Sequence, residues 1–420
     1  MTAVRLWAGR TFRSLAIRNY RLYFIGQVIS FSGTWMQIVA QMWLVLRLTG
    51  SGVALGVTTA LQFLPVLLAG AWGGVVADRF DKRRVLIWTQ TASGVLALAL
   101  ALLVATGSVE LWMVYGLAAL LGCVTVIDNP TRQSFVMEMV GPREVTNAVG
   151  LNSTIFTSAR VVGPAIAGVL IASAGLVACF FVNALSYVAV IAALRRMDPL
   201  ELHRTPAEPR RRGQLMEGLR YAWSEPELRL PLLLMAVIGT LAFNFRVLLP
   251  LMAQETFGGT AGTYGTLAAV MGAGTVGGAL LIAGRKRPTR RMLIGSALLY
   301  GLSIILAGLA PTLGLELVTL VPLGAAGVAF SSTANAALQL NSADTMRGRV
   351  MALYAVTFLG TTPIGSPFIG WIAEAFGVRA AFLVGGGAAV AAAGAALFSR
   401  ARSRSVTLLR SRSAREETAA

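Results

Sequence analysis

The sequence predicts an all-α polytopic membrane protein with twelve transmembrane helices in two six-helix halves and both termini in the cytoplasm. Three observations lead to this prediction. The 420-residue chain is 56% hydrophobic and 13% charged, and that charge is about half of what an average soluble domain carries. Its apolar residues gather in runs of about 20, the length that crosses a bilayer. Its positive charges lie between these runs in the segments that would share one side of the membrane.

Twelve apolar runs divide the chain. In order, they cover residues 22–46, 54–77, 85–106, 111–129, 147–172, 177–195, 231–254, 262–284, 292–310, 316–338, 350–374 and 379–398. One long polar connection separates the first six runs from the last six. The predicted organisation is a cytoplasmic N-terminal segment (1–21), an N-terminal half (22–196), a cytoplasmic linker (197–230), a C-terminal half (231–398) and a basic cytoplasmic tail (399–420).

The positive charge of the chain follows this topology. Net charge is +18 and the isoelectric point is near 11.3, values that would suggest nucleic-acid binding in a soluble protein. With the N-terminus in the cytoplasm, all of the 36 Lys and Arg residues fall in cytoplasmic segments except Arg47, Arg160, Arg246 and Arg379. Such a bias orients membrane proteins, so no nucleic-acid partner is predicted. The basic tail could also contact anionic lipid headgroups.

Cysteine and histidine are too few for a metal centre or a catalytic triad. Cys123 and Cys179 lie in separate apolar runs, and His203 is the single histidine. The glycine-rich stretches lack the context of a phosphate-binding loop. The sequence therefore predicts neither an enzyme nor a bound metal or cofactor.

The two halves are related by an internal repeat. Three glycines in and just after the fifth run match three glycines in and just after the eleventh at one constant offset: Gly163, Gly168 and Gly175 with Gly365, Gly370 and Gly377. Parallel six-plus-six repeats are typical of secondary transporters, whose substrate site lies between the halves.

Two motifs carry a resemblance to a known family. Residues 74–84 join the second and third runs and read Gly-Val-Val-Ala-Asp-Arg-Phe-Asp-Lys-Arg-Arg. They resemble the G-x-x-x-D-R-x-G-R-[RK] signature of the major facilitator superfamily, except that Asp81 stands where the family usually has Gly. The stretch 163–168 is similar to the G-P-x-x-G element of drug antiporters. Residues 128–133, 152–160 and 217–221 resemble the transmembrane secretion effector branch, which includes the enterobactin exporter and macrolide-efflux proteins.

The resemblance implies the major facilitator fold and a proton-driven exporter of a small amphipathic molecule, siderophore-like or drug-like, that works by alternating access. It implies a monomer in the bacterial cytoplasmic (inner) membrane. It also implies a cytoplasmic gate motif that latches the halves in the outward-open state, and a helix-packing motif. The gate residues are Gly74, Asp78, Arg79, Lys82 and Arg83; the packing residues are Gly163, Pro164 and Gly168. An uptake permease, a uniporter and a receptor or scaffold without transport remain alternatives.

Ionisable residues inside spans are functional candidates, because a charge in the hydrocarbon costs at least about 2.5 kcal/mol. Arg160 and Arg246 reach similar depths in opposite halves when residues are counted along their helices. Together they could attract an anionic or electron-rich substrate; each could instead bind helix-end carbonyls. Asp128 is the candidate proton carrier, and a structural pair with Arg132 is the alternative.

Uncharged polar residues at helical spacing are further candidates for the substrate cavity. They are Gln37, Gln41, Asn152, Asn244, Asn335 and Gln339. Amides also form ordinary helix–helix contacts. Trp35 and Phe63 are interpreted as core or lipid-facing residues rather than as part of a binding site.

Overall fold

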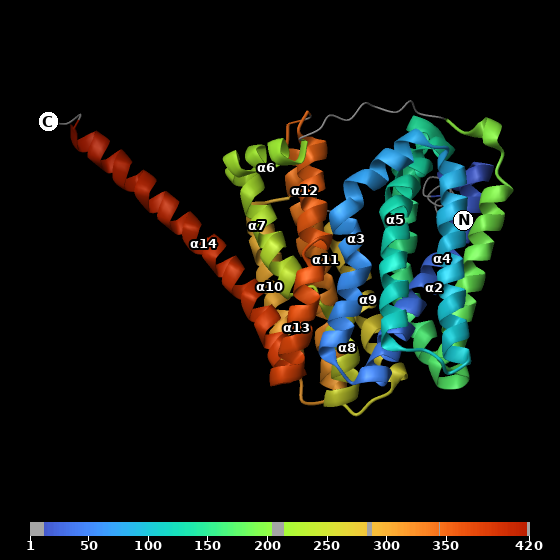
Figure 1. Cartoon of the computed structure of the whole chain (residues 1–420). Helices are drawn as coiled ribbons and strands as arrows, with labels where there is room; N and C mark the ends of the chain where they lie inside the picture. Colours follow the sequence, from blue (N-terminus) through green and yellow to red (C-terminus); the bar gives the residue numbers. More distant parts are fainter. Residues whose placement is uncertain (1–11, 204–213, 284–287, 344, 418–420) are drawn as a thin grey trace, which may run out of the picture.

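The computed structural model describes residues 12–203, 214–283, 288–343 and 345–417. These residues form a bundle of long helices whose axes run in similar directions (Figure 1). We call the end that holds the turn at residues 80–81 the inner end, because its arginines predict that it faces the cytoplasm. The opposite end is the outer end. Parts of the predicted N-terminal segment, linker and tail, together with Arg285, Lys286 and Arg287, lie outside the described residues.

The N-terminal half contains η1 (Arg13–Ala16), α2 (Arg18–Thr49), α3 (Gly52–Arg79), α4 (Lys82–Ala105) and α5 (Leu111–Arg195). The long α5 bends sharply at Gly141 and Gly175, whose φ angles of 69° and 79° are readily adopted by glycine. It therefore has three legs, 111–140, 142–174 and 176–195 (Figure 1). The helix of the fourth predicted span extends beyond residue 129: it continues through Pro130 and turns only at Gly141.

The linker and the C-terminal half contain the remaining elements. They are η2 (Pro199–Glu201), α6 (Gln214–Ser224), α7 (Pro226–Leu241), α8 (Phe245–Leu251), η3 (Met252–Thr256), α9 (Ala261–Ala283), α10 (Arg290–Leu309), α11 (Leu313–Asn341), α12 (Arg347–Leu359), α13 (Thr362–Phe376) and α14 (Val378–Glu417). The predicted seventh span is continuous, whereas the structure breaks it between α7 and α8. The Asn244 side chain donates to the carbonyl of Thr240 at 2.7 Å, the acceptor that a helical amide of Asn244 would use.

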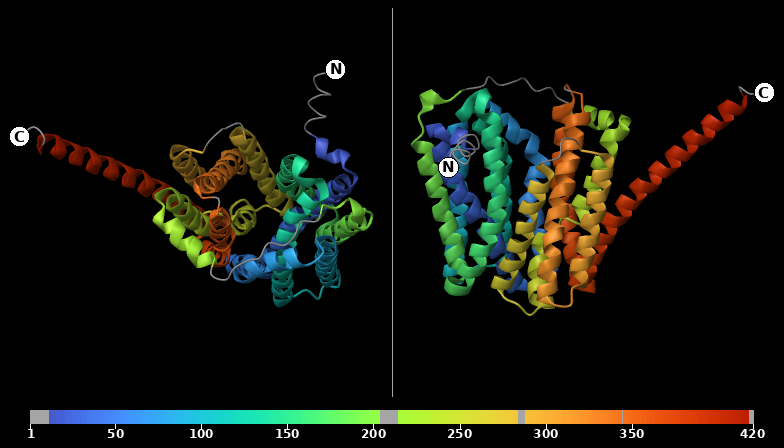
Figure 2. Two further views of the ribbon diagram at one scale, coloured as in Figure 1. Left: turned by 90° about the horizontal axis from the view of Figure 1, so that it is seen from above. Right: turned by 180° about the vertical axis from the view of Figure 1, so that it is seen from behind.

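The described residues contain ten helical segments that are long and apolar enough to cross a membrane, and one of them is α5 with its three legs. This total is consistent with the predicted twelve crossings. The all-helical membrane fold is confirmed, and Figure 2 shows the helices gathered into two groups when seen from above.

The repeat appears in the structure as equivalent helix contacts. Gly175 and Gly377 both adopt positive φ, 79° and 87°, at the turns that end matching helices. A side chain at Gly168 would touch Gly262 of α9, and one at Gly370 would meet the carbonyl of Gly52 in α3. Each half thus lays its matching helix against a helix of the other half, as a pseudo-two-fold relation requires.

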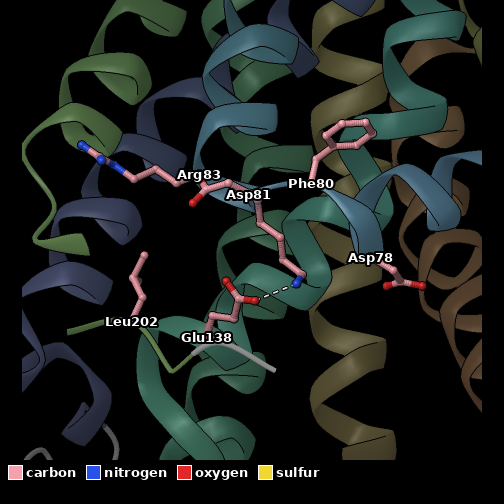
Figure 3. Close-up of a pocket in the computed structure, with 7 residues that line it drawn as sticks. Asp78, Phe80, Asp81, Arg83, Glu138 and Leu202 are labelled. Carbon is pink, nitrogen blue, oxygen red and sulfur yellow. Dashed lines mark hydrogen bonds and ion pairs between the residues drawn. The ribbon is translucent and has the colours of Figure 1, made fainter. Parts of the chain in front are cut away.

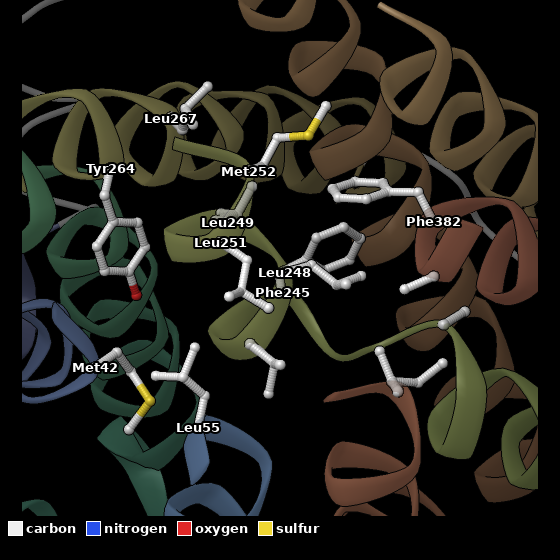
Figure 4. Close-up of a cluster of buried hydrophobic side chains, with 14 of the residues drawn as sticks. Met42, Leu55, Phe245, Leu248, Leu249, Leu251, Met252, Tyr264, Leu267 and Phe382 are labelled. Atoms are coloured by element: carbon white, nitrogen blue, oxygen red, sulfur yellow. The ribbon is translucent and has the colours of Figure 1, made fainter. Parts of the chain in front are cut away.

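The two halves meet through an apolar cluster near the outer end (Figure 4). Met42 and Leu55 from the N-terminal half are buried together with Leu248, Tyr264 and Leu267 from the C-terminal half. Burial of such side chains is worth about 1.5–3 kcal/mol each. The cluster therefore seals the outer part of the interface between the halves.

A polar contact closes the outer end of the same interface. Glu374 of α13 accepts hydrogen bonds from the Ser51 hydroxyl at 2.7 Å and from the Val53 amide at 3.2 Å. These donors belong to the N-terminus of α3, where a carboxylate is favoured by the helix dipole. Glu374 thus joins the halves as an outer latch.

A Glu374→Ala variant should open the outer end more often, because it removes this contact between the halves. With Cys123→Ser, Cys179→Ala and Ser366→Cys as background, a membrane-impermeant maleimide should label position 366 several-fold faster, since Ser366 is now 1% exposed. Glu110→Ala is the matched control, because Glu110 contacts Trp112 of its own half. An unchanged labelling rate would show that Glu374 does not hold the gate.

Candidate functional site

Two arginines from opposite halves share one aromatic ring at the centre of the molecule. The guanidinium carbon of Arg160, in the second leg of α5, lies 5.1 Å from the centre of the Trp35 ring. That of Arg246, in the first turn of α8, lies 5.8 Å from the same ring. Each guanidinium also lies over a second ring: Arg160 is 5.3 Å from the centre of the Phe156 ring, and Arg246 is 5.1 Å from the centre of the Phe63 ring. Such contacts contribute about 2 kcal/mol when desolvated.

Neither arginine of this pair has an acidic partner among the residues that the structure describes. Arg246 donates to the Gln62 side-chain oxygen at 3.0 Å, and no ion pair joins Arg160 or Arg246 to a carboxylate in the described part of the chain. The Nε of Arg160 is buried without a hydrogen-bond partner. A buried donor costs about 1–3 kcal/mol when it is left unpaired. The pair therefore forms a positive, aromatic site that no carboxylate of the described residues neutralises.

Local structure explains how these side chains meet. Phe156 and Arg160 are four residues apart on one helix and so share a face. A side chain at Gly163 would collide with the backbone and Cβ of α2 at Trp35, so the glycine lets the second leg of α5 approach Trp35 closely. The break after α7 places Arg246 at the start of α8. Glycine and helix break together bring the two halves' arginines to one ring.

An aromatic column extends from this site toward Arg132. Trp35 and Phe156 have ring centres 6.1 Å apart, and Phe156 and Phe31 are 5.5 Å apart, both in edge-to-face geometry. Arg132 lies over the Phe31 ring at 5.0 Å. The column therefore connects the central arginines with the polar network of the first leg of α5.

Asp128 is the centre of that network. Its Oδ1 accepts from the Thr89 hydroxyl at 2.6 Å and from the Gln90 amide at 2.8 Å, and its Oδ2 pairs with Arg132. Arg132 also donates to Gln27. The helix that continues past Pro130 is what places Arg132 one turn from Asp128. The carboxylate is buried, at 6% exposure, and its charged form is well satisfied.

Among the described residues, no hydrogen bond joins the uncharged candidates to Arg160 or Arg246. Gln37 accepts from Asn183 at 2.6 Å within the N-terminal half, Gln41 is buried in α2, and Asn244 accepts from Ser366 at 2.8 Å beside the α7–α8 break. Within α11, Gln339 donates to Asn335 at 2.6 Å. Asn152 lies two turns from Arg160 on the same leg, and its Oδ1 is buried without a partner.

The gate motif lines a pocket of about 170 Å³ at the inner end (Figure 3). Lys82 pairs with Glu138 at 2.6 Å, while Arg83 donates to the carbonyls of Leu194 and Arg195 at 2.6 and 2.9 Å. These contacts all lie within the N-terminal half. In Figure 3 the Asp78 carboxylate points away from the Lys82–Glu138 pair. The two other residues of the gate motif are Gly74, which is buried, and Arg79, which is exposed.

Loss of Lys82 should destabilise the protein strongly. The side chains of Lys82 and Glu138 are 9% and 8% exposed, and removing one partner of a buried pair costs about 3–5 kcal/mol because the other charge stays buried. Lys82→Met should therefore lower the melting temperature clearly, and Lys82→Met with Glu138→Leu should recover most of it. Arg79→Met is the exposed control. Equal losses in the single and double variants would contradict the pairing.

The aromatic residues of the site contact guanidinium groups, a role that their sequence context alone does not predict. Trp35 and Phe63 were expected in the core or against lipid, but both lie over guanidinium groups. Phe31 and Phe156 were not considered. The spacing of four between Phe31 and Trp35, and between Phe156 and Arg160, is the signal that points to a shared helix face.

Comparison with protein families supports the membrane-transport interpretation. Residues 10–417 match the family described as transmembrane secretion effector. The chain is similar to the Staphyloferrin A transporter of Staphylococcus aureus, with 26% identity over 87% of this chain and 92% of the relative. It is also similar to the multidrug efflux pump Tap of Mycobacterium tuberculosis, with 27% identity over 86% and 88%.

A solved structure shows the same fold. It is a bacterial homologue of the human lysosomal transporter Spinster in an inward-facing, unoccupied conformation, with a TM-score of 0.70 and 16% identity over 90% of this chain and 94% of the other. The predicted resemblance to the secretion effector branch is confirmed by the family match.

Proposed function

Because the chain belongs to the transmembrane secretion effector family of the major facilitator superfamily, we propose that it exports a small amphipathic anion of the siderophore or drug class in exchange for protons. The protein is a secondary transporter and a multi-pass protein of the bacterial cytoplasmic membrane. Its substrate is a small molecule. The anionic character, the export direction and the proton coupling are the proposal.

The observation that carries the proposal is the arginine pair over Trp35. Two like charges at one ring repel each other, and no carboxylate of the described residues neutralises them. An anion between them would remove the repulsion and satisfy the free Nε of Arg160. Trp35, Phe63 and Phe156 would contact the apolar part of the same molecule. Since the arginines come from opposite halves, the anion would favour the state that brings the halves together.

Proton coupling is assigned to Asp128. Protonation of its carboxyl would remove the charge that holds Arg132, and Arg132 rests on the aromatic column that ends at the central site. Proton binding and substrate binding would then act on the same column. The remaining candidates would contact substrate in another state of the cycle; they are Gln37, Gln41, Asn152, Asn244, Asn335 and Gln339.

The unit of transport is proposed to be the monomer in contact with anionic lipid. One chain supplies both arginines and the outer latch, so a second copy is not needed to complete the site. Arginines at the inner end would meet anionic headgroups.

Everted membrane vesicles with an acid interior test the proposal. Catechol siderophores, macrolides and cationic dyes are added in turn, with empty-vector vesicles as the control. Collapse of the gradient by an anionic compound, dependent on the protein, is the expected result. Response to cationic dyes alone would contradict the assigned substrate class, and transport into right-side-out vesicles without proton movement would favour an uptake permease or uniporter.

A further inference from the structure

A second carboxyl group is buried in the other half of the molecule. Glu316 lies in the first turn of α11 and is 0% exposed. Both of its carboxylate oxygens are buried without a hydrogen-bond partner. This differs from Asp128, whose oxygens accept from three side chains. A buried carboxyl with no donor around it calls for an explanation, since such groups are rare in folded proteins.

Among the described residues, one charged side chain acts on Glu316. Arg379, in the first turn of α14, is the charged group whose field reaches Glu316, but it makes no ion pair with it. Its Nη2 instead donates to the carbonyl of Ala310 at 2.9 Å, at the turn between α10 and α11. Glu316 and Arg379 are therefore neighbours that are not paired in this state: Arg379 binds the Ala310 carbonyl, and the Glu316 carboxyl oxygens have no hydrogen-bond partner.

The helices packed against α11 bring no other charge to this end. Their charged residues lie at the inner end: Glu227 and Arg229 of α7, Arg290 and Arg291 of α10, and Arg347 and Arg349 of α12. The described residues of α9 carry none. The titratable side chains on these helices that remain are tyrosines, Tyr264 of α9, Tyr300 of α10 and Tyr354 of α12.

Two opposing effects act on the Glu316 carboxyl. A carboxylate ion that is buried without a partner is strongly disfavoured, so the geometry suits the neutral acid. The N-terminus of α11 and the nearby Arg379 favour the negative charge instead. A group under such opposing effects changes its protonation when a small movement alters either one.

We propose that Glu316 is a proton-binding site at the outer end of the C-terminal half, with Arg379 as its exchange partner. In the state seen here the carboxyl holds a proton and Arg379 holds the Ala310 carbonyl. When the outer end opens, the proton leaves to water and Arg379 moves onto the carboxylate. The transport consequence rests on the proposed proton-coupled export, whereas the proton binding itself needs no substrate.

Infrared spectroscopy of the full-length protein in lipid nanodiscs tests this site. The wild type should show the C=O band of a protonated carboxyl near neutral pH, shifted in D2O. Glu316→Gln should lack that band while keeping the melting temperature, because Gln has the shape of the neutral acid. Glu110→Gln is the matched control at the outer end and should keep the band.

Arg379→Gln gives an independent test that does not depend on folding of the Glu316 variant. The band disappears as the pH is raised, and the midpoint of this loss is measured. Removing the positive neighbour should move that midpoint by about one pH unit or more toward alkaline pH. A band that persists in Glu316→Gln, or a midpoint that does not move in Arg379→Gln, would overturn the assignment. Because neither measurement uses transport, failure here leaves the proposed export standing, and absent export leaves this proton site standing.

Discussion

An Arg160→Ala variant is expected to bind the anionic substrate about 10- to 100-fold more weakly, since a hydrogen bond to a charged group contributes about 1.5–3 kcal/mol. Arg160 offers the unpaired buried Nε and stacks on both Trp35 and Phe156. Export in everted vesicles should fall in proportion at low substrate concentration. The measurement is the substrate concentration that gives half-maximal collapse of the proton gradient.

Two further variants separate recognition of the anion from simple charge. Arg160→Lys keeps the charge but loses the planar guanidinium that binds carboxylates and stacks on rings. Its affinity for the anionic substrate should therefore lie between that of the wild type and that of Arg160→Ala. Arg47→Ala removes an exposed arginine of α2 and should behave as the wild type. Unchanged export by Arg160→Ala would show that the arginine pair does not bind the substrate.

An Asp128→Asn variant is expected to lose proton-driven transport and to retain substrate exchange. Asparagine can still accept from Thr89 and Gln90, but it cannot gain and lose a proton. Reconstituted vesicles measure both activities: net flux under an imposed pH gradient, and exchange of labelled for unlabelled substrate at equal pH. Net flux should fall at least about tenfold, while the exchange rate stays within about twofold of the wild type. This pattern is expected because only net proton-driven transport needs Asp128 to bind and release a proton.

The alternative role of Asp128 gives a different pattern. If the Asp128–Arg132 pair is purely structural, Asp128→Asn leaves Arg132 buried without its counter-charge, and melting temperature, net flux and exchange all fall together. Glu110→Gln is the control for loss of a carboxylate outside the network. Proton-driven flux that persists in Asp128→Asn would exclude it as the coupling residue.

The helical membrane fold could be predicted from the sequence because span length and the side preference of arginine are local properties. The break between α7 and α8 could not. It depends on Asn244, whose side chain binds Thr240 and Ser366, and Ser366 lies more than a hundred residues away in the chain. Whether the helix of the fourth span continues past Pro130 could not be decided from the sequence for a related reason, since proline in a helix depends on the packing around it.

The arginine pair could be predicted by counting depth along two helices, but its aromatic partner could not. Trp35 is an ordinary apolar residue by composition, and its place over Arg160 depends on the close approach that Gly163 allows. Glu316 illustrates the same point. The sequence places it at an outer helix end, where a carboxylate is usually solvated, whereas the structure buries it completely.

The most direct measurement compares binding of an anion and of its neutral analogue. The compound selected in the vesicle assay and its ester are titrated calorimetrically into the purified protein in nanodiscs, for the wild type, Arg160→Ala and Arg246→Ala. The paired arginines over Trp35 predict that the wild type prefers the anion about tenfold or more, and that either variant loses this preference. Equal binding of anion and ester by the wild type would contradict the central claim.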